Sequence, residues 1–153
     1  MHFLVLSGPN LNMLGIREPE VYGTGTYKEL VAFVQDICDK RGVEVEFFQT
    51  NHEGAIIDYL QSTAWKFDGI VFNPAAFTHT SVAIGDTLKY VPCPVVEVHL
   101  SDLTKREPFR QVSYIRGSCI GTAMGLGFGG YEKAVDMLLE YISNTEITGQ
   151  RLR

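Results

Sequence analysis

Residues 68–102 read DGIVFNPAAFTHTSVAIGDTLKYVPCPVVEVHLSD, and this stretch decides the fold. It begins with an apolar run at 68–74 that an asparagine and a proline end, as expected of a buried strand. A segment with helical spacing follows at 80–90, with its cap expected near Thr78. A second apolar run at 94–100 completes a strand–helix–strand unit, which is typical of a parallel sheet.

The same alternation extends toward the N-terminus. An apolar strand is predicted at 2–7, and a helix at 26–42 begins with a Thr–Glu capping box and ends at a glycine. Residues 43–48 alternate between apolar and polar side chains, which suits an edge strand better than a central one. A further helix is expected at 53–63.

Toward the C-terminus, a polar stretch at 101–118 leads to a weak fifth strand at 119–124 and a helix with one apolar face at 131–142. The tail at 144–153 is expected to be frayed. Five strands separated by helices predict an α/β fold, a flavodoxin-like doubly wound five-stranded parallel sheet. The edge-like second strand favours the order 2-1-3-4-5, and residues 1–153 are expected to form a single domain.

The composition is that of a globular domain with an acidic balance. The 153 residues are 45% hydrophobic and 20% charged, which excludes a disordered or fibrous chain. The net charge of −5 argues against nucleic acid or an anionic membrane as a partner. The apolar stretch at 3–6 is too short for a signal peptide or a membrane span. Three widely spaced cysteines without a CxxC pair predict free thiols and a cytoplasmic protein.

Polar side chains cluster in the segments that leave the carboxyl ends of the predicted strands. In open parallel sheets, ligands bind at this edge, near the point where the strand order reverses. These segments carry three of the four histidines, and we expect the following residues to converge: Asn10, Asn12, Asn51, His52, Asn73, His79, His99 and Ser101. Such a rim would hydrogen-bond a small, hydroxylated, neutral-to-anionic ligand.

Residues 11–25 form a long loop without hydrophobic periodicity. A loop of that length in a compact domain is usually a lid or a binding loop. It contains Arg17 and Tyr22. An arginine beside a tyrosine stabilises the phenolate, which would make Tyr22 a usable base. The alternative is a surface arginine and a tyrosine that only packs.

Glu97 and His99 lie two residues apart on a predicted strand and therefore on the same face. There the carboxylate could orient the imidazole or favour its protonated form. The alternative is a histidine whose ring bonds to the backbone at the strand end. Arg110 could reach back over the same rim. Asp86 lies seven residues after His79, two helical turns away, and is expected to point off the rim, toward a neighbouring subunit.

Two other patterns carry no predicted site. Gly125, Gly127 and Gly130 imitate a dinucleotide-binding fingerprint, but that motif belongs to a first strand–helix unit, and no strand follows here. We interpret them as a tight packing turn between a strand and a helix. The histidines have no HxxxH or HExxH spacing, so neither a metal nor another cofactor is expected.

Six blocks of the sequence resemble the motifs of a known family: SGPNLNMLGIREPEVYG, QTNHEG, FNPAAFTHTSVAIGD, PVVEVHLSD, EPFRQVSYI and GFGGYEKA. In this order and spacing they resemble the type II 3-dehydroquinate dehydratase family, over about residues 3–139. The resemblance implies an enzyme that converts 3-dehydroquinate to 3-dehydroshikimate, in the shikimate pathway or in quinate catabolism. The implied reaction is an anti elimination of water through an enolate, without a metal or a Schiff-base lysine.

The resemblance also implies roles for individual residues. Tyr22 is expected to be the base, Arg17 to keep it ionised, and His99 to protonate the leaving hydroxyl, while Asn10 holds a water or the enolate oxygen. The other matched positions are expected to bind substrate: Asn73 with the backbone amides of Leu100 and Ser101 for the carboxylate, His79 and Arg110 for the ring hydroxyls, and Asp86 from the next subunit. The family's assembly implies a homo-oligomer, a dodecamer made of four trimers.

The sequence departs from the family at Ser7 and Asp102, where asparagine is common, and in RGSCIG (116–121), which replaces a more proline-containing stretch. These departures are expected to affect pocket tuning and subunit packing rather than the reaction. One rival hypothesis is a flavin- or phosphate-binding module on the same fold, for which the loop SGPNLN is poor in hydroxyl side chains. Another is a purely structural oligomer, which would leave the polar rim and the long loop unexplained.

Overall fold

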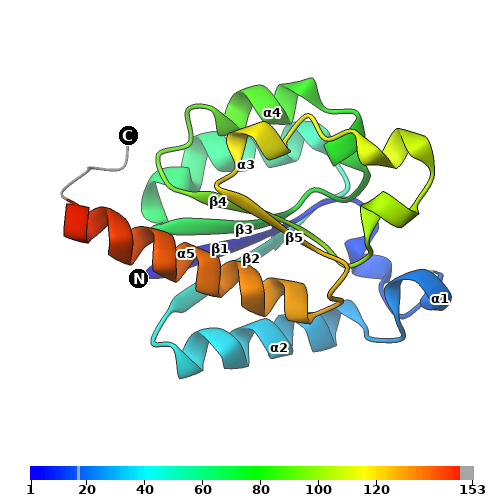
Figure 1. The fold of residues 1–153 in the computed structure, drawn as a ribbon, viewed down its shortest axis with the longest axis horizontal. Helices are drawn as coiled ribbons and strands as arrows, with labels where there is room; N and C mark the ends of the chain where they lie inside the picture. The colour runs from blue at the N-terminus through cyan, green and yellow to red at the C-terminus, as the bar shows by residue number, and fades with distance from the viewer. Residues whose placement is uncertain (17, 149–153) are drawn as a thin grey trace.

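The computed structural model describes residues 1–16 and 18–148, without the side chains of Pro19, Tyr22 and Thr148. One sheet of parallel strands forms the centre, in the order β2-β1-β3-β4-β5 that the sequence predicts (Figure 1). The strands are β1 (His2–Ser7), β2 (Glu44–Gln49), β3 (Gly69–Asn73), β4 (Val95–His99) and β5 (Gly121–Met124).

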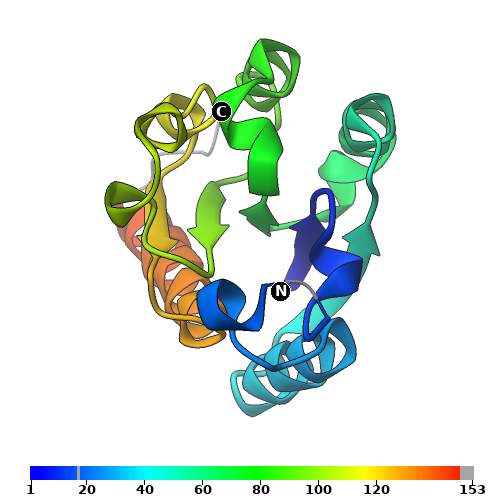
Figure 2. The ribbon, with the colours of Figure 1, turned by 90° about the vertical axis from the view of Figure 1, so that its right-hand side faces the viewer.

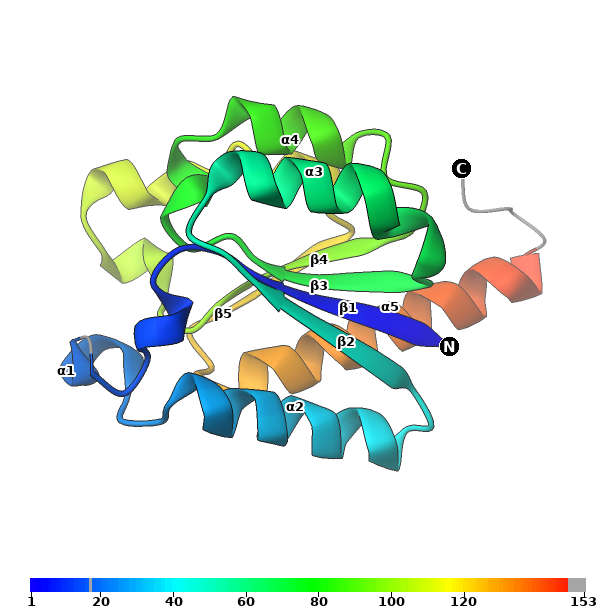
Figure 3. The same ribbon diagram turned by 180° about the vertical axis from the view of Figure 1, so that it is seen from behind.

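Helices cover both faces of the sheet, α2 and α5 on one face and α3 and α4 on the other (Figures 1 and 3). The helices are α1 (Pro19–Tyr22), α2 (Tyr27–Lys40), α3 (Glu53–Thr63), α4 (Val82–Leu88) and α5 (Gly129–Thr148). Short 3-10 turns occupy the connections: η1 (Leu11–Met13), η2 (Ala64–Lys66), η3 (Ala75–His79), η4 (Leu103–Lys105), η5 (Pro108–Gln111) and η6 (Arg116–Ser118).

Alternation along β1 builds a core on each face of the sheet. Phe3 and Val5 pack with Tyr131 in the core under α2 and α5, whereas Leu4 and Leu6 belong to the core under α3 and α4. All five side chains are almost fully buried. Burial of an apolar side chain of this size contributes roughly 1.5–3 kcal/mol, so the two-sided packing of a central strand stabilises both layers at once.

The strand register gathers the carboxyl ends at one edge of the sheet. Ser7 pairs with both Gln49 and Asn73, and His99 pairs with Met124. Figure 2 looks onto this edge, with the loops that follow the strands toward the viewer. The segments after β1, β3 and β4 therefore meet here, as the sequence predicts.

The start of α4 differs from the prediction. The helix begins after Ser81, whose Oγ accepts a hydrogen bond from the Ile84 N–H at 2.9 Å, and not near Thr78. Thr78 lies in η3 instead, and its hydroxyl donates to a buried carboxylate. Ser81 therefore caps α4, because its hydroxyl accepts from an amide in the first turn of the helix. The hydroxyl of Thr78, three residues earlier, is instead bonded to Glu97.

The start of α2 is as predicted, and α5 extends into the region of the predicted tail. Thr26 and Glu29 form the predicted capping box at the start of α2. Helix α5 continues past Asn144, where the sequence suggested a frayed tail, because no glycine or proline occurs before residue 149. Residues 149–153 of that predicted tail lie outside the described residues. None of the described helices combines the length and the apolar character needed to cross a membrane.

Candidate active site

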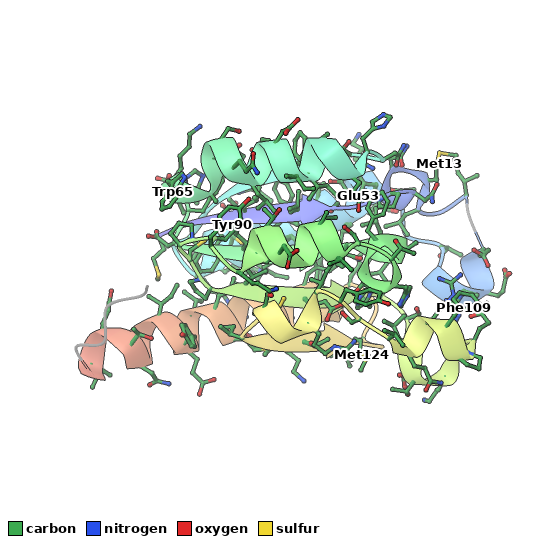
Figure 4. The ribbon with its side chains drawn as sticks, turned by 90° about the horizontal axis from the view of Figure 1, so that it is seen from above. Met13, Glu53, Trp65, Tyr90, Phe109 and Met124 are labelled. Carbon is green, nitrogen blue, oxygen red and sulfur yellow. The ribbon has the colours of Figure 1, made fainter. Side chains whose placement is uncertain are left out.

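A cavity opens at the carboxyl edge of the sheet, between the loops that follow β1, β3 and β4. Together with the solvent at its open mouth it holds about 550 Å³ of empty space. Its described lining contains amides, two imidazoles and two guanidinium groups and no carboxylate. The exposed side chains of Met13 and Phe109 lie at this end of the molecule, and those of Trp65 and Tyr90 at the other (Figure 4).

The cavity brings together most of the residues predicted from the sequence: Asn10, Asn73, His79, His99, Leu100, Ser101 and Arg110. Arg17 lies outside the described residues, and so does the side chain of Tyr22. Three other residues of the predicted rim do not line the cavity. His52 is exposed just before α3, and the Asn12 and Asn51 side chains accept hydrogen bonds from Gln49 beside the cavity.

The loop after β1 reaches the cavity because two unusual backbone positions allow it. A Cβ on Gly8 would lie 2.5 Å from the Pro74 carbonyl oxygen, so only glycine permits this approach of the loops after β1 and β3. Asn10 has a left-handed backbone (φ 66°), which asparagine tolerates, and its N–H donates to Asn51 Oδ1 at 2.9 Å. The first loop is thereby fixed against the ends of β2 and β3.

Asn73 is held by two hydrogen bonds at the floor of the cavity. Its Nδ2 donates to the Tyr131 hydroxyl at 2.9 Å, and its Oδ1 accepts from the Ala75 N–H at 3.1 Å. Ala75 has a left-handed backbone (φ 50°), a strained conformation for a residue other than glycine. Because the amide is buried and each of its ends makes one of these bonds, the orientation of the Asn73 side chain is fixed.

Glu97 and His99 form the pair that their spacing predicts. The His99 Nε2 and Glu97 Oε1 atoms are 2.8 Å apart, and both side chains are nearly or fully buried. Because an ionised carboxylate can only accept hydrogen bonds, Nε2 carries the hydrogen and donates it. Nδ1 is then the ring nitrogen available to exchange a proton with a ligand in the cavity.

A set of donors keeps the Glu97 carboxylate ionised. Burial by itself raises the pKa of this carboxyl, but hydrogen bonds from His99 and Thr78 and the charges of His99 and Arg116 outweigh it and lower the pKa to about 2. Arg116 Nε donates to Oε2 at 3.0 Å, and Ser113 donates to Oε1 at 3.1 Å. The buried anion is thus fully satisfied at neutral pH.

His79 and Arg110 also line the cavity. His79 Nδ1 lies 2.7 Å from the Val112 carbonyl oxygen, which can only accept, so Nδ1 donates and Nε2 is left for a ligand. Burial, with the neighbouring His99 and Arg110 charges, lowers the pKa of His79 despite the Val112 carbonyl and the Glu97 charge. The ring is therefore neutral at pH 7, suited to hydrogen bonding with a hydroxyl group.

Arg106 also lines the cavity and was not predicted from the sequence. Its Nη1 donates to Ser101 Oγ at 3.4 Å, and Glu107 contacts both Arg106 (3.4 Å) and Arg110 (3.0 Å). The four-residue spacing of the two arginines could have indicated a shared direction, but the segment lacked a predicted element. Two guanidinium groups at one cavity suit an anionic ligand even though the chain as a whole is acidic.

Asp86 lies away from this cavity, on the exposed side of α4, where it pairs with Lys89 at 2.6 Å. The direction agrees with the prediction, but the reasoning from two turns of one helix is wrong. His79 belongs to η3, which ends before α4 begins.

The glycine-rich stretch before α5 is a packing turn, as interpreted from the sequence. Gly125 and Gly127 have left-handed backbones, and their N–H groups donate to the carbonyl oxygens of His99 and Leu100. These amides hold β5 against the cavity wall. Within the described residues, no group of His, Cys, Asp or Glu side chains is arranged to hold a metal ion.

Known proteins are similar to this chain in sequence and in architecture. The family model described as "Dehydroquinase class II" matches residues 1–139. A 3-dehydroquinate dehydratase from Clostridium acetobutylicum is 48% identical over 143 residues, which cover 94% of this chain and 99% of the relative. The crystal structure of a type II dehydroquinase from Butyrivibrio crossotus is similar with a TM-score of 0.89 and 47% identity, and the match covers 91% of this chain and 97% of that one. Because the match extends over nearly the whole length of both chains, this protein belongs to the class II dehydroquinase family.

Proposed function

We propose that this chain dehydrates 3-dehydroquinate to 3-dehydroshikimate, in the shikimate pathway or in quinate catabolism, as a single catalytic domain in the cytoplasm. The observation that carries the proposal is the buried Glu97–His99 pair, whose imidazole lines a cavity together with amides, a hydroxyl, a second imidazole and two guanidiniums. A hydroxylated ring with one carboxylate needs such partners, and its dehydration needs an acid. Relatives that share the fold and the sequence carry this activity in their names. Free thiols suit a reducing compartment.

The proposed elimination uses one base and one acid from different segments. Tyr22, kept ionised by Arg17, removes the proton on the carbon next to the ketone, and Asn10 holds a water or the enolate oxygen directly. His99 then delivers a proton to the hydroxyl that leaves as water. Residues 11–25 act as a lid over the reacting ring.

The remaining cavity residues orient the ring. Asn73 and the backbone amides of Leu100 and Ser101 bind the carboxylate, which suits amide donors at a strand end. His79 and Arg110 bind the ring hydroxyls. The bond from His79 Nδ1 to a carbonyl supports this role, since it fixes the ring with Nε2 available to the cavity.

The product is an enone that absorbs in the ultraviolet, so absorbance after mixing protein with 3-dehydroquinate tests the proposal. Tyr22→Phe and His99→Ala should each lower kcat by orders of magnitude while substrate still binds. Tyr141→Phe, on the exposed side of α5, and His2→Ala, at the opposite end of β1, are matched controls that keep wild-type turnover. Treatment with borohydride in the presence of substrate should leave activity intact, since no Schiff base forms. No enone from the wild-type protein would refute the proposed function, and near-normal turnover in either site variant would refute its assigned role.

We also propose that the chain works as a homo-oligomer, a dodecamer of four trimers, in which Asp86 completes a neighbour's site. Val82 and Tyr114 are apolar and about half exposed, and the Tyr114 carbonyl packs against Gly85, next to Asp86. An exposed apolar surface beside a carboxylate that its own cavity does not use suits an interface between subunits.

Mixing two inactive variants tests this assembly. Tyr22→Phe lacks the base and Asp86→Ala lacks the residue supplied in trans, so subunits that exchange should form some sites with both groups intact. Recovery of turnover after unfolding and refolding the mixture supports the proposal, with each variant refolded alone as the control. Failure to recover turnover, when sedimentation shows mixed oligomers, would exclude a shared site.

A further inference from the structure

Arg116 binds the carboxylate that orients the proposed acid. It is the first residue of η6. Its Nε donates to Glu97 Oε2 at 3.0 Å, and the other oxygen of the same carboxylate contacts His99. Glu97 is fully buried, whereas the Arg116 side chain is 39% exposed. Arg116 is therefore linked to His99 through one shared partner, the Glu97 carboxylate.

We propose that Arg116 is a positioning residue that, through Glu97, makes His99 a stronger acid and stabilises the ring in the state it reaches after proton transfer. The proposal rests on the function proposed above, in which His99 protonates the leaving hydroxyl. Arg116 does not line the cavity and is not expected to touch the substrate.

The charge around Glu97 differs before and after that transfer. A protonated His99 beside the Glu97 carboxylate is a neutral pair. Once His99 has given up its proton, Glu97 would be left as a buried anion with only neutral partners, which is costly. Arg116 supplies the missing positive charge at 3.0 Å, so the group as a whole becomes neutral when the proton leaves.

The hydroxyl groups around Glu97 cannot replace this charge. Thr78 and Ser113 donate to Oε1, and Thr122 donates to Oε2 at 3.4 Å, but all three are neutral. They satisfy the carboxylate equally before and after the transfer. Of the ion pairs that Glu97 makes in the described part of the chain, the one with Arg116 is permanent and the one with His99 ends when the proton leaves.

The other titratable and charged groups near the pair do not supply a positive charge to Glu97. Burial and the Glu97 charge raise the pKa of the Cys119 thiol to about 12 despite Arg116, so it stays neutral in an assay. His79, whose pKa burial lowers, is neutral at pH 7. Arg106 and Arg110 line the cavity and contact Glu107 rather than Glu97. Replacing Arg116 with a neutral residue therefore removes the permanent positive charge that Glu97 contacts directly.

Four proteins test the proposal: wild type, R116Q, R116K and R41Q. R41Q is the matched control, because Arg41 joins α2 to Glu132 and Asp136 on α5 with comparable ion pairs away from the cavity. The first readout is an NMR titration of the ¹³C-labelled His99 ring, assigned by its loss in H99Q. The second is the pH dependence of kcat with 3-dehydroquinate.

In R116Q, the midpoint of the His99 titration should move upward by about half a pH unit, a modest value for a neighbouring charge that is partly exposed. The alkaline limb of the kcat profile should move by the same amount, and kcat at pH 7 should fall by up to about threefold with KM unchanged, because only part of the change in acid strength is felt in the transition state. R116K keeps the charge and should restore most of both values. R41Q should change only the urea midpoint.

An unmoved His99 midpoint in R116Q, or equal effects of R116Q and R116K, would overturn the proposal, because the charge would then not be the cause. The NMR titration needs no turnover. A wild-type protein without turnover would therefore refute the proposed function while the His99 midpoints still decide whether Arg116 acts through Glu97.

Discussion

Two buried hydroxyl groups between β1 and α5 should respond oppositely to removal. The Tyr131 hydroxyl accepts from Asn73 Nδ2, so Tyr131→Phe leaves a buried N–H without an acceptor and should lower the free energy of unfolding by about 1–2 kcal/mol. Ser7 Oγ is fully buried and meets no partner with hydrogen-bond geometry among the described residues, although it lies near enough to the Tyr27 and Tyr131 hydroxyls to lower their pKa values against the effect of burial. Its removal in Ser7→Ala takes away a desolvated polar group and should raise stability by about 0.5–1 kcal/mol.

Urea unfolding at pH 7 measures both effects, with the slope of the transition unchanged. For a chain of this size, 1 kcal/mol corresponds to about 2–4 °C in Tm, so the two variants should separate clearly in a thermal scan at equal chain concentration. Tyr141→Phe, exposed on the same helix, should stay within about 0.5 kcal/mol of wild type.

A Ser7→Ala protein that is destabilised as much as Tyr131→Phe would refute this reasoning. The Ser7 hydroxyl would then be bonded to Tyr27 or Tyr131, the two phenols beside it, and both pKa values would reflect that bond as well as burial. The sign of one measured difference therefore decides whether this hydroxyl is satisfied in the folded protein.

Two further predictions concern the pair at the site and the loops around it. The pKa of Glu97 is lowered from 4.5 to about 2 in the folded protein, so its contribution to stability is present above pH 4.5 and is lost as the pH falls. By pH 2 the free energy of unfolding of wild type should therefore have fallen by about 3 kcal/mol more than that of Glu97→Gln, as measured by urea unfolding. Equal losses would show that Glu97 is not the group that titrates. Gly8→Ala should cost more than about 2 kcal/mol and most of the activity, because its Cβ meets the backbone of Pro74 at 2.5 Å. Gly121→Ala should cost less, as its Cβ meets the flexible end of Met137; circular dichroism melts of the two variants compare them, and equal costs would contradict this.

Much of the fold could be predicted because it depends on local patterns. Continuous apolar runs identified β1, β3 and β4, and the half-polar run at 43–48 correctly placed β2 at an edge. The pairing of Glu97 with His99 followed from the period of two along one strand. The cap of α4 was assigned wrongly because Thr78 and Ser81 are equally suitable caps in sequence. Tertiary contacts, a buried carboxylate in particular, decided between them.

The missed residues are those whose partners lie far along the chain. Tyr131 meets Asn73 across 58 residues, and in the sequence it was simply one apolar position on a helix face. Arg116 meets Glu97 across 19 residues, from a segment without predicted structure. No periodicity connects such pairs. The roles proposed for Arg17, Tyr22 and Asp86 involve a long loop without periodicity and a contact between subunits, and no pattern within one segment of the sequence encodes either.

The Glu97 carboxylate connects the stability of the fold with the chemistry of the cavity. Its donors come from β4, η3, η6, β5 and the segment before η6, so one buried charge joins the strand that carries His99 to the connections around it. Burial alone would make this carboxylate unfavourable, and it is tolerated because every donor is in place. Loss of a neutral donor should therefore lower the stability of the fold and leave His99, the proposed acid, less firmly oriented. Loss of the Arg116 charge should in addition shift the pH dependence of kcat. That difference separates a structural partner of Glu97 from one that acts on the reaction.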